Sequence, residues 1–183
     1  KVKEEIRQER EENSKRKKIE EQLKESLPLL REKFLNSLLN GDFKKESEIR
    51  SKLEFLGISL ELENFIIFII DIEYGRTTSN AQQEKEKQVI RFSVLNLLKE
   101  LLQEEQNILI FNGLVDNIHG IATFGRHISA AVSYIQLSRL LDRIRGFIWK
   151  SLNIYVTIGV SRLNSRWDRI NEAYMEASDA IKY

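Results

Sequence analysis

The residue types best suited to chemistry in this sequence are two acids, Asp71 and Glu73, which follow the apolar run at residues 65–70. Side chains two residues apart on a strand lie on the same face, and carboxylate oxygens are ligands that divalent cations prefer. Metal-assisted phosphoryl transfer depends on several metal contacts and on groups that position the substrate. Acids at a strand end also have a structural role, since they keep the following loop in water. We therefore retain Asp71 only as a candidate for a metal ligand.

Other residue types that carry chemistry are few and scattered. There is no cysteine, which excludes thiolate metal sites and disulfides, and the two histidines, His119 and His127, have no third ligand grouped with them. No Gly-x-Ser-x-Gly turn and no phosphate-binding glycine loop occurs. The glycines at 113, 120 and 125 are expected to serve turns. The sequence thus predicts no catalytic residue, no metal site and no cofactor.

Composition narrows the class of protein further. The 183 residues are enough for one full domain plus an appendage, and a net charge of +1 gives no global attraction to nucleic acid or anionic membranes. The longest apolar run, 65–70, is far shorter than the ~20 residues of a membrane helix. We expect a cytoplasmic protein without membrane contact. Because the chain begins with Lys1 and its last helical pattern still runs at Tyr183, we also expect a piece of a longer protein.

The elements that must position these residues begin with a long helix over 1–40, whose first 18 residues are almost entirely polar. An apolar stripe then follows one face at helical spacing, through Ile19, Leu23, Leu27, Leu30, Phe34 and Leu38. An isolated helix is marginal in water, so we predict a parallel coiled-coil homodimer with Ile19, Leu23, Leu30 and Phe34 in its interface. A helix docked on its own domain is the alternative. Pro28 is expected to kink or restart the helix, with Ser26 or Leu27 as the cap.

A mixed α+β domain is predicted over 41–183. Asn40–Asp42 should end the first helix and cap a lead-in helix over 43–56, which Gly57 terminates. The order that follows is strand 63–74, a polar loop, helix 84–105, hairpin strands 107–111 and 118–124, helix 127–152, strand 154–161 and helix 167–183. Right-handed crossovers fold such a β-α-β-β-α-β chain into a ferredoxin-like antiparallel sheet with two helices on one face. The lead-in and closing helices remain to cover the other face, which explains an apolar run without alternation at 65–70.

Several segments resemble a known family. They are residues 23–41, the segment Leu53-Glu-Phe-Leu-Gly-Ile-Ser-Leu60, the strand ending in Asp71-Ile-Glu73, and the tail 158–182 with small residues at Ala173, Ala177 and Ala180. Together they resemble the middle region of bacterial AraC-type response regulators, where a helical linker leads into a nucleotide-cyclase-like domain of the GGDEF superfamily. In active members an acid at the place of Asp71 holds a metal. The catalytic signature should stand where this chain reads Asn112-Gly-Leu-Val-Asp-Asn-Ile-His-Gly120, which lacks its paired glycines and acids.

This resemblance implies a module that is not an enzyme. The expected function is signal relay and dimerisation in a two-component transcriptional regulator, coupling a receiver to an AraC-type DNA-binding domain that lies outside this sequence. Membrane-anchored AraC-type regulators share the same block, so the nature of the input stays open. The alternative is a domain that senses a small ligand or nucleotide in a remnant cyclase cleft.

Overall fold

The computed structural model describes residues 2–74 and 80–182. Its helices are α1 (Val2–Leu39), α2 (Glu46–Leu56), α3 (Asn80–Leu101), α4 (Ala130–Leu152) and α5 (Ile170–Ile181), with a short 3-10 turn, η1 (Trp167–Arg169), before α5. Its strands are β1 (Phe65–Ile72), β2 (Ile108–Asn112), β3 (Asn117–Thr123) and β4 (Val156–Val160). In this part of the chain no helix is long and apolar enough to cross a membrane.

The four strands form one antiparallel sheet in the order β2-β3-β1-β4. This mixed α+β arrangement agrees with the predicted order of elements. Gly120 lies inside β3 rather than at a turn, so its expected role was wrong. A Cβ at this position would come within 2.0 Å of the Phe68 ring, which shows that the glycine makes room for a neighbouring core side chain.

Both faces of the sheet are covered, and β1 contributes to two cores. Ile66, Phe68 and Ile70 pack with α3 and α4 on one face. Phe65, Ile67 and Ile69 pack with α2, α5 and the end of α1 on the other. The six residues 65–70 are all buried, because alternate side chains of a strand point to opposite faces. This confirms that the lead-in and closing helices cover the second face.

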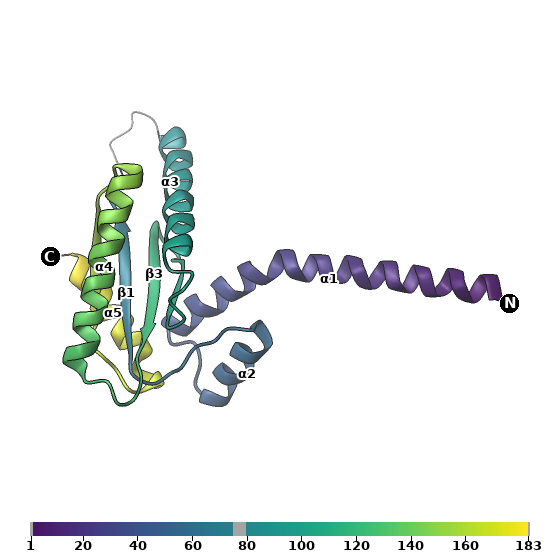
Figure 1. The fold of residues 1–183 in the computed structure, drawn as a ribbon, viewed down its shortest axis with the longest axis horizontal. Helices are drawn as coiled ribbons and strands as arrows, with labels where there is room; N and C mark the ends of the chain where they lie inside the picture. Colours follow the sequence, from purple (N-terminus) through teal and green to yellow (C-terminus); the bar gives the residue numbers. More distant parts are fainter. Residues whose placement is uncertain (1, 75–79, 183) are drawn as a thin grey trace.

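The long helix α1 is divided between solvent and the domain (Figure 1). Residues 2–26 are exposed along their whole length, whereas Phe34, Leu35, Leu38 and Leu39 are buried in the second core. Phe34 is only 6% exposed and its ring lies 5.4 Å from that of Phe43. Phe34, which was predicted in the dimer interface, therefore packs in its own domain. The packed unit begins before the predicted boundary at residue 40.

Two predicted helix ends differ from those observed. The helix α1 is continuous through Pro28, and the Ser26 hydroxyl donates to the carbonyls of Gln22 and Leu23 instead of capping a new helix. The N-cap position of α2 is occupied by Lys45, whose side chain makes no capping hydrogen bond. Asp42 was expected to cap this helix and does not. Gly57 does end α2 in a left-handed conformation, and Ser129 caps α4 by accepting from Val132 N at 3.3 Å.

The predicted polar loop at 75–83 was too long. Residues 75–79 lie outside the described part of the chain, and α3 begins at Asn80 rather than at residue 84. The segment after Asn80 is rich in Gln, Glu and Lys, which are good helix formers. Their polarity indicated exposure and was mistaken for irregular structure. The helix ends at Leu101, four residues before its predicted end at 105.

Candidate functional site

Asp71, the remnant metal-ligand candidate, lies near the end of β1 between Asn117 of β3 and Thr157 of β4. It is half-buried. Burial raises the pKa of its carboxyl group, and the neighbouring charge of Glu73 raises it further. Within residues 2–74 and 80–182 there is no group of three or more His, Cys, Asp or Glu side chains that could hold a metal ion. The geometry thus gives Asp71 a like-charged neighbour that disfavours its ionised form.

Asp116 joins the turn between β2 and β3 to α3 and to Tyr74, which follows β1. Its carboxylate lies 3.2 Å from Arg91 Nη1 and 3.5 Å from Lys87 Nζ, and its carbonyl accepts from the Tyr74 hydroxyl at 3.0 Å. Burial first, and then the charge of Asp116, raises the pKa of Tyr74 to about 12. Arg91 also reaches the Val115 carbonyl at 3.3 Å. The side chains of Lys87 and Arg91 are thus both paired with the carboxylate of Asp116 in the hairpin turn.

His119, in the hairpin strand β3, is buried and packs against two aromatic rings. Its ring makes edge contacts with Phe111 at 5.7 Å and with Tyr174 of α5 at 5.1 Å. It is 1% exposed, and burial lowers its pKa to about 4. Neither ring nitrogen has a hydrogen-bond partner among the described residues, and the same holds for Asn117 Oδ1. His119 is therefore a neutral core side chain, because burial without hydrogen-bond partners disfavours the imidazolium cation.

The end of α1 is bonded directly to this hairpin. The Asn36 amide donates to the Asn112 carbonyl at 2.8 Å, and the Asn112 amide donates to Glu32 Oε2 at 2.9 Å. Asn36 also donates to the Glu32 carbonyl one turn earlier in α1. Arg31, also in α1, donates to the Leu56 carbonyl at 2.7 Å and so joins α1 to the end of α2. Helix α1 and the hairpin are thus joined by two hydrogen bonds at Asn112, the last residue of β2. One is from the Asn36 amide to a backbone carbonyl, and the other is from the Asn112 amide to the Glu32 carboxylate.

Comparison with known proteins identifies this scaffold. The sequence profile described as a GGDEF-like domain matches residues 40–183. The chain belongs to the GGDEF-like domain family. No curated protein and no solved structure matches the chain. The GGDEF-like domain includes β1 and the hairpin described above, while most of α1 precedes it.

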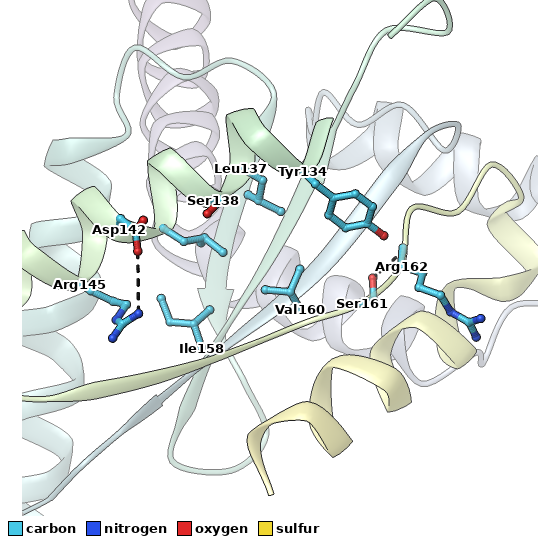
Figure 2. A pocket seen from close by; sticks show the side chains of 10 residues that line it. Tyr134, Leu137, Ser138, Asp142, Arg145, Ile158, Val160, Ser161 and Arg162 are labelled. Carbon is cyan, nitrogen blue, oxygen red and sulfur yellow. Dashed lines mark hydrogen bonds and ion pairs between the residues drawn. The ribbon is translucent and has the colours of Figure 1, made fainter. Parts of the chain in front are cut away.

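The GGDEF-like domain also carries a groove at the other edge of the sheet, between α4 and the edge strand β4 (Figure 2). It has a volume of about 450 Å³. Its floor is apolar, formed by Leu137 and Leu141 of α4 with Ile158 and Val160 of β4. Asp142 and Arg145 lie over the Ile158 end, and Tyr134 and Arg162 lie at the other end. The Tyr134 hydroxyl accepts from Leu163 N at 2.7 Å.

The sequence did not reveal three of these features: the Asn36–Asn112 contact, the Asp116 cluster and the burial of His119. Asn36 offered a usable signal, because it is a polar residue inside the apolar sequence Phe34-Leu-Asn-Ser-Leu-Leu39. A polar residue amid core positions is expected to have a hydrogen-bond partner. Asp116 and His119 offered no comparable signal, since their neighbours come from segments remote in the sequence.

Proposed function

We propose that the chain is a non-catalytic relay and dimerisation region of an AraC-type transcriptional response regulator, which couples a receiver domain to a DNA-binding domain. The observation that carries this proposal is the pair of hydrogen bonds joining α1 to the hairpin through Asn112. A helix with a solvent-exposed first half thereby ends on the place where a cyclase would have its catalytic turn. A change in the pairing of α1 thus has a direct mechanical route into the domain.

The chemistry of the hairpin supports a non-catalytic role. Phosphoryl transfer relies on metal ions and on free cations that stabilise the phosphates. Here Lys87 and Arg91 are engaged by Asp116, and the turn residues Leu114 and Val115 are apolar and exposed. Asp71 has a raised pKa and one acidic neighbour. These features of the described residues support a domain that does not bind a nucleoside triphosphate with its metal ions.

Dimerisation is supported by the exposed half of α1. Ile19, Leu23 and Leu30 are 57%, 51% and 40% exposed, and they follow one helix face. Phe34 lies on the same face but packs in its own domain, so we assign the dimer contact to Ile19, Leu23 and Leu30. Burying these side chains against a second copy stabilises by roughly 25 cal/mol per Å² of apolar surface.

Enzymatic activity provides the first test. The protein is incubated with Mg²⁺ or Mn²⁺ and with GTP or ATP, and cyclic products are sought by mass spectrometry. We expect no product. Turnover that disappears in an Asp71→Ala variant would contradict the proposal.

The relay is tested by insertions near Lys15 in the longer regulator. Two added helical residues rotate the upstream part by about 200°, and four rotate it by about 40°, whereas seven nearly restore the phase. We expect signal-dependent DNA binding to be lost with two residues and largely kept with seven. Equal responses to all three insertions would mean that α1 is a passive tether.

A further inference from the structure

The strand β4 leaves one edge of the sheet open. It pairs with β1 alone. Ser161 N donates to the Ile67 carbonyl, and Glu73 N donates to the Tyr155 carbonyl. In an antiparallel pair, hydrogen-bonded and non-hydrogen-bonded positions alternate. The phase set by these bonds therefore directs the N–H and C=O groups of residues 156, 158 and 160 away from β1.

This edge lacks two of the devices that commonly protect an open strand. The sequence Val156-Thr-Ile-Gly-Val160 contains no lysine and no proline, although exposed edges are commonly blunted by charge, proline or bulges. The opposite edge, β2, has α1 beside it, with Asn36 donating to the Asn112 carbonyl. In the part of the chain that the structure describes, no segment pairs with the outer side of β4. The outer edge of β4 is therefore free to pair with another strand.

The helix α4 presents a matching stripe next to this edge. Five exposed residues recur along it at alternating spacings of three and four: Ile135, Ser138, Asp142, Arg145 and Trp149. Such spacing places side chains on one helix face and is typical of helix–helix contacts. Figure 2 shows Asp142 and Arg145 above Ile158, on the α4 side of the groove. The stripe and the free edge of β4 therefore form one continuous surface.

We propose that this surface, made of the α4 stripe and the outer edge of β4, binds a second copy of the chain. Two β4 strands would pair antiparallel about Ile158, with Val156 opposite Val160 of the second copy. The same two-fold axis sets the two α4 helices antiparallel beside each other. Asp142 then faces Arg145 of the second copy, and Trp149 faces the small Ser138. Each contact occurs twice, as an isologous interface requires.

The charge pattern favours a second copy over an unrelated strand. Asp142 and Arg145 lie 3.8 Å apart within one chain and are both well exposed, so each keeps hydrogen-bonding capacity for a partner. In the symmetric pair every such charge meets its opposite. The contact is separate from the α1 contact, because α1 lies beside β2 and the proposed surface lies at the other edge of the sheet. The inference therefore goes beyond the proposed function and does not rest on it.

The decisive experiment is done in a Leu23→Glu background, which removes the apolar contact expected of α1. Sedimentation equilibrium up to about 1 mM populates contacts with micromolar to millimolar Kd. We expect reversible dimers. Asp142→Arg should weaken them about tenfold by placing like charges opposite each other, and adding Arg145→Asp should restore them. Both residues are exposed, so folding is preserved. A monomer throughout the concentration range, or dimers insensitive to the charge swap, would overturn the proposal.

A cysteine pair gives the register. The chain has no native cysteine, so an introduced one reports its own contact. In the same background, Ile158→Cys should form a disulfide-linked dimer under mild oxidation, because residue 158 lies opposite itself. Thr157→Cys is the matched control, since the proposed register sets it opposite Gly159 of the second copy. Equal cross-linking at both positions, or none at residue 158 in a dimeric sample, would overturn the strand pairing.

Discussion

The two halves of α1 are built from similar residues but have different surroundings. Leu23 is half-exposed in the first half, whereas Leu35 and Leu38 of the second half are buried against the sheet. The first half is stabilised as a helix by pairs such as Arg7–Glu11 at i, i+4, and the second by tertiary packing. This difference teaches that a single apolar stripe can serve two partners in succession. One partner is the chain's own domain, and the other, in our proposal, is a second copy.

The largest expected effect is on the second half. Leu38→Ala should lower the free energy of unfolding by about 2–5 kcal/mol, because it removes a side chain that is 1% exposed and leaves a cavity. Leu23→Ala is the matched control in the first half. At concentrations where the protein is monomeric it should change stability by less than about 0.5 kcal/mol. Urea denaturation measures both values, and comparable losses would erase the contrast between the halves.

The core beneath the second half is expected to be sensitive to acid. The pKa of His119 is lowered to about 4 by burial, from an ordinary value of 6.5. The contribution of neutral His119 to the free energy of unfolding is therefore fully present above pH 6.5. It declines as the pH falls from 6.5 to 4, and it does not change further below pH 4. The total loss is about 3 kcal/mol. His119→Phe should remove this part of the pH dependence when unfolding is followed between pH 7 and 4. If the pH profiles of the original protein and the variant coincide, the pKa of His119 is the same in the folded and unfolded states, which would contradict this prediction.

The contact between the second half and the hairpin should contribute less. Asn36→Ala removes the donor to the Asn112 carbonyl and should lower the free energy of unfolding by about 1–3 kcal/mol, since a partly buried acceptor loses its partner. Ser26→Ala is the control, because Ser26 bonds only to carbonyls of its own helix in solvent. Its expected effect is within about 0.5 kcal/mol. An Asn36 variant as stable as the Ser26 variant would remove the proposed route from α1 to the hairpin.

The smallest effect is expected for the exposed charges of the first half. Arg7→Ala breaks a solvent-exposed pair with Glu11. The change should destabilise the helix by about 0.2–0.5 kcal/mol and thus slightly reduce the helical signal. Circular dichroism at low and high salt measures the change. A difference that does not shrink with salt would mean that Arg7 has a partner other than Glu11.

Local patterns predicted the scaffold well. The apolar run at 65–70 specified a strand covered on both faces, and Gly57 specified the end of α2. The helix predicted over 127–152 begins three residues later, at Ala130. Each of these depends on residues close in the sequence. The stripe of α1 was also predicted, but periodicity cannot distinguish burial on a domain from burial on another chain. This is why Phe34 was placed in the dimer contact although it lies in the core.

The site depends on long-range contacts and was predicted only in part. Asp71 was located correctly at the end of β1, but its neighbours on β3 and β4 come from segments more than 40 residues away. Pro28 illustrates another limit. A proline inside a helix removes one backbone hydrogen bond, yet α1 continues through Pro28. The second half of α1 is packed in the domain, and local sequence rules do not contain that packing.

The central claim, that the first half of α1 pairs in parallel with a second copy, is tested most directly by cysteine cross-linking at one helical turn. In a parallel pair, Leu23 faces Leu23 of the second copy, whereas Gln22 points about 100° away. At tens of micromolar, Leu23→Cys should form a disulfide-linked dimer rapidly, and Gln22→Cys should do so slowly. Equal rates at the two positions, or no cross-link at residue 23, would contradict the account.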